Sequence, residues 1–417
     1  MDRLLEKLRD MGPKAILAVL AAALLFVGIV AGVVIGVVET DKENRTRETN
    51  EAIRMDEVRR QQRVLSRLDA VCTDAREQAT AALPGFILLG DDLTAGAGGN
   101  KTDYAITLQQ AIAEKILNTF RFSDAVPAEY RRVVKNNEKR YALSEAQMTR
   151  DGISGASTAT VLSVDGAYSI VTTEEITVPA GTENVAIKFR SERGDLIDPL
   201  CNGSRRIAVY LTAGDGEEKV FGTLSLRTAT EPAEYLFCRE TEATEPTVLP
   251  AGSQIVTRRS LEDRDRFPIV WMGMNGGYDT VEELIEQHIA LLSDKPLYAE
   301  GYYLVIGLLD STPAEEAAFE AAFGDHYLNA RVFLNERGRE TEGQNATGKE
   351  RTVVENGEVP LSMRDKFDDV RTPFYLNNEG YAAIGREVFR KIDEMGYFGA
   401  IRGVIAEAME AAASINE

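Results

Sequence analysis

Histidine and cysteine are scarce in this 417-residue chain, which holds two of the former, His288 and His326, and three of the latter. A mechanism that needs an imidazole base therefore has two candidates. The cysteines, Cys72, Cys201 and Cys238, form no CxxC pair, which removes the spacing typical of zinc or thioredoxin-type sites. We expect no metal and no cofactor. Cys201 and Cys238 lie in the same β-rich stretch, and whether they pair as a disulfide stays open.

Positive charge is also in short supply. The chain has 47 Lys and Arg against 67 Asp and Glu, a formal net charge of −20. Nucleic-acid binding needs a basic face, so the overall charge argues against nucleic acid as a partner. Hydrophobic residues make up 44% and charged residues 27% of the chain, which is typical of a globular protein. At roughly 150 residues per domain, the length predicts two or three domains.

Charge is absent altogether from residues 15–38, a run of 24 residues. A membrane-spanning helix needs roughly 20 apolar residues, whereas the apolar region of a cleaved signal peptide has about 7–15 and ends at a small-x-small site. This run is longer and ends in Val38-Glu39. We predict an uncleaved single-pass transmembrane helix in the cell membrane. Residues 1–14 are expected in the cytoplasm and the rest of the chain outside, although basic residues flank both ends almost equally.

Glycine recurs every four residues within this run, at Gly28, Gly32 and Gly36. The spacing puts all three on one helix face, as in GxxxG pairs, and predicts a homo-oligomer. The alternative is that glycine is simply common in membrane helices.

Residues 39–83 follow as a highly charged segment that predicts a helical stalk. Apolar residues at 58, 65, 68, 72, 75 and 79 suggest a short coiled-coil seam, which Gln61 interrupts. The alternative is a spacer helix that packs once on the globular domain.

A short apolar strand, 86–89, opens the globular part and runs into a turn of small residues, before a helix expected at about 104–120. Strand, turn and helix in this order begin an α/β layer fold. Ligands of such folds lie at the carboxyl ends of the strands, where this turn falls.

Four segments between residues 84 and 397 resemble, in order, the motifs of the SGNH/GDSL hydrolase family. They read GDDLTAG at 90–96, DGISGAST at 151–158, IVWMGMN at 269–275 and TPFYLNNEGY at 372–381. The spacing looks most like a branch with a β-rich insertion between the second and third motifs. The resemblance implies a three-layer, flavodoxin-like α/β fold with a parallel sheet.

The resemblance also assigns site positions. Asp92 stands where the family has its serine nucleophile, Thr372 where it has the catalytic aspartate, and Tyr375 where it has the histidine. Gly155 and Asn275 match the two residues that donate hydrogen bonds to the oxyanion. The catalytic side chains are therefore replaced, and the oxyanion donors are kept.

Acyl transfer needs an activated hydroxyl, a base within reach and donors directed at the oxyanion. Asp92 brings a negative charge that opposes an oxyanion in the same cavity, and a tyrosine such as Tyr375 is normally protonated at neutral pH. His288, in an amphipathic helix, and His326, in a turn, are expected to be structural. A metal site at Asp91 and Asp92 is a lesser alternative, since paired aspartates are common in turns.

We therefore expect a pseudoenzyme that binds a surface ligand, such as an acylated cell-surface glycan, or an envelope protein. Two alternatives stay open. One is an active esterase or acyltransferase with a non-standard catalytic set. The other is a structural membrane protein whose stalk and glycine face drive assembly.

Residues 167–260 change to alternating polar and apolar residues, for example at 184–190, 206–211 and 220–226. Period two with Gly and Pro turns predicts an inserted antiparallel β-sandwich-like domain. Its role is either ligand binding or that of a lid or spacer. The SGNH-like domain then comprises 84–166 and 261–397. Polar residues 336–357 predict a loop, and 398–417 a C-terminal helix.

Overall fold

The structure, a computed structural model, divides into two compact units, residues 1–72 with 412–417 and residues 73–411. It describes residues 12–100, 102–136, 138–193, 199–200, 206–214, 218–227, 234–341, 348–366 and 374–414.

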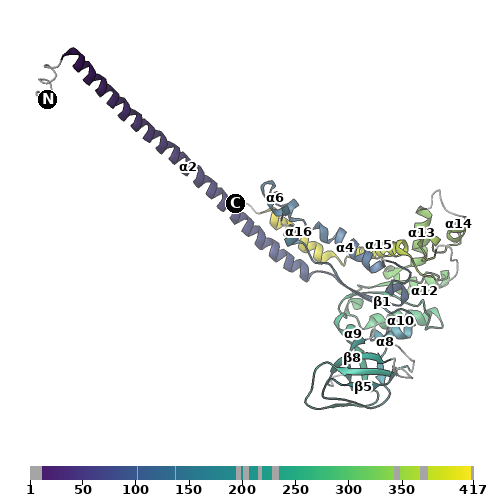
Figure 1. Cartoon of the computed structure of the whole chain (residues 1–417). Helices are drawn as coiled ribbons and strands as arrows, with labels where there is room; N and C mark the ends of the chain where they lie inside the picture. The colour runs from purple at the N-terminus through teal and green to yellow at the C-terminus, as the bar shows by residue number, and fades with distance from the viewer. Residues whose placement is uncertain are drawn as a thin grey trace. The chain divides into compact units, whose positions relative to one another are not determined.

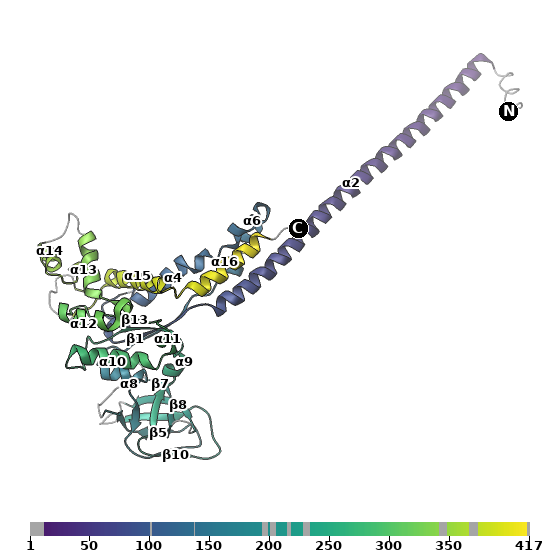
Figure 2. The ribbon, with the colours of Figure 1, turned by 180° about the vertical axis from the view of Figure 1, so that it is seen from behind.

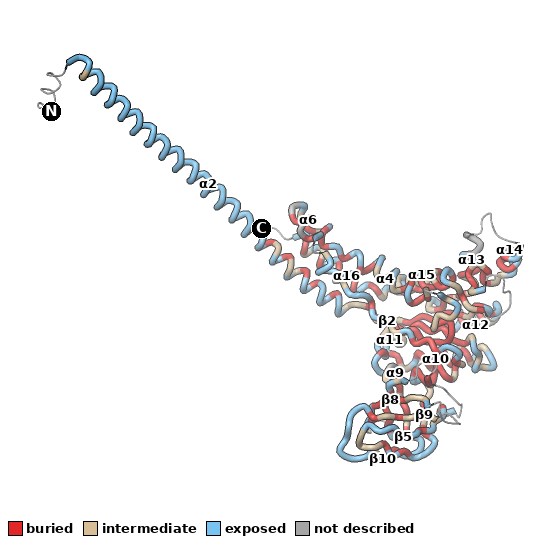
Figure 3. The backbone as a smooth tube through the Cα atoms, in the orientation of Figure 1, coloured by how far each residue is buried: buried red, intermediate tan, exposed pale blue. Residues whose placement is uncertain are grey.

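A single 69-residue helix, α2 (Pro13–Ala81), makes up the described N-terminal part. It contains the whole predicted span 15–38, and its apolar side chains there, from Leu17 to Val38, are exposed (pale blue in Figure 3). By length and composition this helix could cross a membrane. Most of the predicted cytoplasmic tail, 1–14, lies outside the described residues.

The predicted stalk is helical as far as Ala81. Leu68, Cys72, Ala75 and Ala79 are buried within the single chain, whereas Val58 is 39% exposed. The larger part of the expected coiled-coil seam is therefore already covered without a second chain.

A five-stranded sheet forms the centre of the second unit (Figure 1), with the order β14-β13-β12-β1-β2 and only parallel pairings. Numbered along the chain among themselves, these strands follow the order 2-1-3-4-5 of doubly wound sheets. The strands are β1 (Gly85–Gly90), β2 (Gln147–Gly152), β12 (Phe267–Trp271), β13 (Leu304–Ile306) and β14 (Tyr327–Leu328).

Helices cover both faces of this sheet (Figures 1 and 2). Alternate residues of β1 point to opposite faces. Ile87 and Leu89 join a core with residues of α8 (Thr158–Val164), α10 (Val281–Ser293) and α12 (Pro313–Phe323). On the other face Phe86 packs against Phe398, and α4 (Tyr104–Lys115) pairs with α15 (Asn378–Glu394). The predicted mixed α/β architecture with a parallel sheet is confirmed.

Shorter helices complete the unit, and two of them overturn a prediction. The segment 336–357, expected as a loop, contains the end of α13 and all of α14. Asn335 ties the two together, because its Nδ2 donates to the carbonyl oxygens of Val354 at 2.9 Å and Glu358 at 2.7 Å. The remaining helices are α3 (Asp92–Ala95), η1 (Leu117–Thr119), α5 (Phe122–Ala125), α6 (Ala128–Asn136), α7 (Glu138–Tyr141), α9 (Arg258–Glu262), α11 (Pro296–Ala299), η2 (Gly324–His326), α13 (Ala330–Thr341), α14 (Gly348–Glu355), η3 (Leu361–Met363) and α16 (Gly399–Ala413).

The insertion is antiparallel throughout its described strands. A seven-stranded sheet has the order β5-β9-β8-β7-β11-β3-β6, and β10 pairs with β4 in a second sheet. Their bounds are β3 (Ile170–Thr172), β4 (Ile176–Val178), β5 (Asn184–Ile187), β6 (Phe189–Ser191), β7 (Arg206–Thr212), β8 (Val220–Arg227), β9 (Glu234–Arg239), β10 (Thr247–Leu249) and β11 (Gln254–Thr257).

The insertion has an apolar core of its own, which includes Val209, Leu224 and Phe237. Its base is joined to the parallel sheet layer, because Thr257 Oγ1 donates to the Val164 carbonyl oxygen at 2.6 Å. Cys238 is a free thiol 3.1 Å from the Thr182 carbonyl oxygen. Its expected disulfide partner, Cys201, lies outside the described residues.

Candidate functional site

Three neighbouring strands of the parallel sheet end side by side. In the register of the sheet, Gly90 at the end of β1 lies opposite Trp271 of β12 on one side and Gly152 of β2 on the other. The chain turns after each strand at this one edge. Because the strand order reverses between β1 and β12, this edge is the switch point where ligands of doubly wound sheets bind.

Glycine is required where these turns crowd together. A Cβ added to Gly90, whose φ is +156°, would lie 1.9 Å from the Trp271 carbonyl oxygen. A Cβ on Gly152 would lie 2.1 Å from the backbone nitrogen of Ala95. The absence of these side chains lets the first turn of α3 lie directly on β2.

Asp91 is buried at the start of α3 and caps that helix. Its Oδ2 accepts hydrogen bonds from the backbone N–H groups of Gly273 and Met274, both at 2.8 Å, and its Oδ1 accepts from Leu93 at 3.3 Å. Burial raises the pKa of Asp91 to about 7, the backbone hydrogen bonds oppose the rise, and the charge of Asp92 adds to it.

Asp92 follows, and its carboxylate is bonded to both predicted oxyanion donors. Its Oδ2 accepts from the Gly155 N–H at 3.0 Å and from Asn275 Nδ2 at 2.6 Å. Its Oδ1 accepts from Ser154 Oγ at 2.6 Å. The structure thus brings Asp92, Gly155 and Asn275 together. The Asp92 carboxylate already accepts hydrogen bonds from both predicted oxyanion donors.

Hydrogen bonds from two helices fix the loop that carries Asn275. Thr158 Oγ1 and Gln287 Nε2 each donate to the Gly277 carbonyl oxygen at 2.9 Å. Asn275 Nδ2 also donates to the Ala156 carbonyl oxygen at 3.1 Å, which links the loop after β12 to the loop after β2. The position of the Asn275 amide is therefore fixed by two helices and a second loop.

Tyr375, which the resemblance predicts to stand in place of a histidine, lies near this carboxylate. Burial raises the pKa of its hydroxyl, and the charges of Asp92, Asp91 and Asp365 raise it further. A phenol with a raised pKa stays protonated and cannot accept a proton from a nucleophile. Thr372, which the resemblance predicts to stand in place of an aspartate, lies outside the described residues.

Neither histidine contacts Asp92. His288 is fully buried on α10, where its Nδ1 lies 2.7 Å from the Leu284 carbonyl oxygen and its ring meets the edge of Phe319. Burial lowers the pKa of His288 to about 4. His326 stacks on Tyr303 at a centroid distance of 4.2 Å. Tyr303 precedes β13, so His326 lies at the amino ends of the strands, opposite the Asp92 edge.

A small cavity adjoins the turn that carries Asp92. It measures about 10 Å³, room for about one water molecule, whereas typical ligand pockets hold roughly 300–1,000 Å³. Its walls are mostly apolar and come from Leu93, Met274, Leu308, Leu309, Asp310 and Phe374. The space beside Asp92 that this cavity offers is too small for an acyl chain or a sugar.

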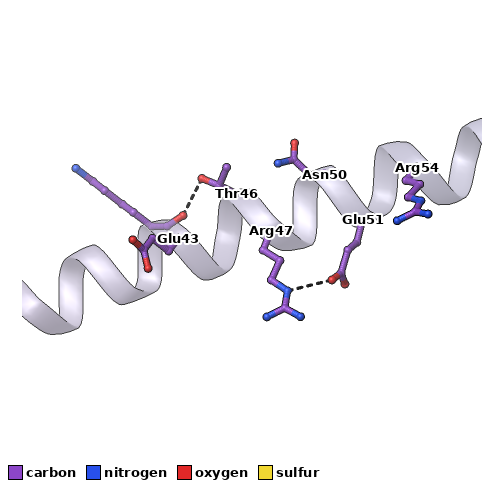
Figure 4. A pocket seen from close by; sticks show the side chains of 7 residues that line it. Glu43, Thr46, Arg47, Asn50, Glu51 and Arg54 are labelled. Carbon is purple, nitrogen blue, oxygen red and sulfur yellow. Dashed lines mark hydrogen bonds and ion pairs between the residues drawn. The ribbon is translucent and has the colours of Figure 1, made fainter.

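A second depression lies on α2 and has a different character. Its lining residues, from Lys42 to Arg54, all belong to that one helix, as Figure 4 shows for the labelled ones. Their contacts are local to the helix: Thr46 Oγ1 donates to the Lys42 carbonyl oxygen at 2.8 Å, and Arg47 Nε to Glu51 at 3.2 Å. A depression walled by a single helix does not enclose a ligand.

Two residues of the site were not singled out from the sequence. Ser154 stands inside the second motif, and its hydroxyl gave no signal apart from its place next to Gly155. Asp91 was considered only with Asp92, as a metal ligand. Among the residues that the structure describes, no group of three or more His, Cys, Asp or Glu side chains is placed to hold a metal ion.

No protein-family model, curated protein or solved structure matches this chain.

Proposed function

We propose that this chain is a membrane-anchored SGNH/GDSL-like protein whose site does not hydrolyse esters and which serves as a binding protein outside the cell. The observation that carries the proposal is the Asp92 carboxylate, which accepts hydrogen bonds from both Gly155 and Asn275. An ester carbonyl can reach these donors only by displacing a charged group that is already bonded to them.

The remaining parts of a hydrolytic site are also unsuited to the reaction. Position 92 offers no hydroxyl nucleophile, and Tyr375 holds its proton. Both histidines bond elsewhere. Donors alone stabilise an oxyanion that forms, but here no group is arranged to form one.

The family proposal is supported by topology as well as by the motifs. The strand order 2-1-3-4-5 is that of flavodoxin-like sheets, and the first three motifs meet at its switch point. The apolar run 15–38 supplies the anchor, with the N-terminus inside. The ligand we propose is an acylated surface glycan or an envelope protein, bound over a surface wider than the small cavity beside Asp92.

One observation favours a second candidate, an esterase or acyltransferase with a non-standard set. Ser154 Oγ lies 2.6 Å from Asp92 Oδ1, the geometry of a hydroxyl paired with a carboxylate base. The same carboxylate accepts two further hydrogen bonds, from Gly155 and Asn275, so its other oxygen is already engaged by donors of the site. We therefore rank this candidate second.

The test uses the full chain in detergent with p-nitrophenyl acetate as substrate. We expect the wild type, Asp92→Ala and Ser154→Ala to show the same background rate. The variant Asp92→Ser/Thr372→Asp/Tyr375→His should gain turnover, with Asp92→Ser alone as its matched control. Wild-type turnover that Ser154→Ala and Asp92→Ala both abolish would replace this proposal with the second candidate.

A further inference from the structure

Two segments of the chain attach the insertion to the parallel sheet layer, and they lie against each other. The outgoing segment starts at Asp165, directly after α8, and the returning segment passes through β11 and α9. Thr257 Oγ1 donates to the Val164 carbonyl oxygen, and a Cβ added to Gly166 would lie 3.2 Å from Ser260 Cβ. Residues 164–166 and 257–260 thus form a closely packed root of the insertion.

The side chain of Asp165 is a buried carboxyl group within this root. The residue is 2% exposed, and neither carboxyl oxygen accepts a hydrogen bond from any residue that the structure describes. A buried carboxyl group avoids the cost of an isolated charge either by keeping its proton or by gaining a cation as partner. Burial raises the pKa of Asp165 to about 7, the charge of Lys295 lowers it and the charge of Asp294 raises it.

Lys295, between α10 and α11, is buried as deeply. Its side chain is 1% exposed, and its Nζ donates to Asp294 Oδ1 at 3.0 Å. The side chain of Asp294 is 36% exposed, so water also solvates that carboxylate. One ammonium group therefore acts on two carboxyl groups, of which Asp294 is partly solvated and bonded to it, whereas Asp165 is buried and has no donor.

Other charged side chains around the root have partners of their own. These contacts are the ion pairs Arg258–Glu240 and Arg266–Asp263, the hydrogen bond from Arg264 Nε to the Asp294 carbonyl oxygen, and the stacking of Arg193 on Tyr168. The lysine between α10 and α11 is thus the cation that acts on the buried aspartate of the root.

We propose that Lys295 exchanges partners at the root of the insertion, bonding to Asp294 while Asp165 holds its proton and to Asp165 once that proton has passed to solvent. Loss of the proton creates a buried negative charge without a donor, and an ammonium group on a flexible four-carbon chain can turn to neutralise it. Asp294 is then left to water at little cost, because a partly exposed ion pair contributes little to stability.

This exchange is a pH-sensitive device in the attachment of the insertion. Above neutral pH an ion pair joins the end of α8 to the residue that follows α10, and below neutral pH that connection is absent. The new pair recovers part of the free energy that ionisation of a buried carboxyl group costs. The attachment of the insertion is therefore stiffer in alkaline than in acidic surroundings.

The test compares melting temperatures of full-length variants in detergent at pH 5.5 and pH 8.5. Asp294→Asn removes the partner that Lys295 uses while Asp165 is protonated, so we expect a larger loss at pH 5.5 than at pH 8.5. In the Asp165→Asn background no second carboxylate is present, and Asp294→Asn should cost the same at both pH values. Asp263→Asn breaks the nearby pair with Arg266 and serves as the matched control, with equal losses expected at both.

A second measurement follows the ionisation of Asp165 directly. Lys295→Gln removes the ammonium group, so the pH at which stability falls through the titration of Asp165 should rise by about one unit. An unchanged midpoint in this variant, or an equal cost of Asp294→Asn at both pH values with Asp165 present, would overturn the proposal. Asp294 is partly exposed, so the first comparison decides the point even where Lys295→Gln does not fold. No residue of the Asp92 site takes part, so the hydrolysis assay neither supports nor weakens the exchange.

Discussion

The side-chain amide of Asn275 donates to Asp92 Oδ2 over 2.6 Å, and this bond joins the loop after β12 to the turn after β1. The same oxygen accepts from the Gly155 N–H at 3.0 Å. A single carboxylate thus connects the ends of all three central strands. Asp92 thus links the loops that follow these three strands.

A double-mutant cycle should show a favourable coupling energy between Asp92 and Asn275. Asn275→Ala leaves the Asp92 carboxylate one donor short, and we expect a loss of about 1–3 kcal/mol in unfolding free energy. Asp92→Ala/Asn275→Ala should cost less than the sum of the two single variants. Denaturant unfolding of the full chain in detergent measures the cycle, and strictly additive costs would show that the bond contributes nothing.

His288 should make the protein less stable in acid. Burial lowers the pKa of His288 to about 4. Between pH 6.5 and 4 this imidazole is therefore protonated in the unfolded chain and neutral in the folded chain. The free energy of unfolding is therefore unaffected by His288 above pH 6.5 and falls as the pH drops toward 4. His288→Phe should remove this dependence, a relative gain of about 3 kcal/mol at pH 4 compared with pH 7.5. Identical pH profiles of variant and wild type would contradict it.

Asp165 should make the protein less stable as the pH rises, which is the opposite of the effect of His288. It is buried, no described donor reaches its carboxylate oxygens, and burial raises its pKa to about 7 although Lys295 lies near enough to lower it. The folded chain holds this proton between pH 3.8 and 7, so stability falls as the pH rises through that range. Asp165→Asn should therefore gain about 2–4 kcal/mol over the wild type at pH 8 and little at pH 4. A variant that is destabilised equally at both values would refute this.

Two glycines offer a matched comparison at the site. Gly90→Ala places a methyl group 1.9 Å from the Trp271 carbonyl oxygen, which cannot move without breaking the sheet. We expect this variant to misfold. Gly155→Ala meets no atom within 4 Å and bears only the strain of φ +73°, about 1 kcal/mol. Melting temperatures of the two full-length variants decide the point, and a Gly90→Ala protein as stable as Gly155→Ala would contradict the geometry.

The glycine face of α2 should govern self-association in the membrane. Open space surrounds Gly28, Gly32 and Gly36 in the single chain, so another helix has room to approach their backbones. Gly28→Ile/Gly32→Ile/Gly36→Ile should lower the crosslinked dimer fraction of the full chain in detergent by several fold. The control Ala22→Ile/Ala31→Ile changes apolar bulk outside the glycine repeat. Equal crosslinking in all three proteins would count against a glycine interface.

The sequence was most informative about local elements. The strand at 86–89, the helix from 104 and the alternating strands 206–211 and 220–226 all occur, because short apolar runs and period-two patterns report burial directly. The pattern also predicted the stalk as a helix. It could not decide what covers the stalk, since the same apolar spacing serves an inter-chain seam and burial within one chain.

The failures came from side chains that act over long sequence distances. Asn335 bonds to Val354 and Glu358, and so turns a polar stretch predicted as a loop into packed helices. At the site, the motifs placed Asp92 and Asn275 in one cavity. Their direct bond depends on side-chain directions set by the loops after β1 and β12, which a linear pattern of residue types does not contain.

Ile207, on the first long strand of the insertion, packs against the cores of both the antiparallel and the parallel sheet layers. The insertion is therefore not a unit that can be removed or transferred without exposing apolar side chains. Excision of residues 167–260 would expose apolar residues of the parallel-sheet layer that Ile207 now covers. Transfer of the same residues to another protein would expose Ile207 itself. Heating should accordingly melt both sheets in one calorimetric transition.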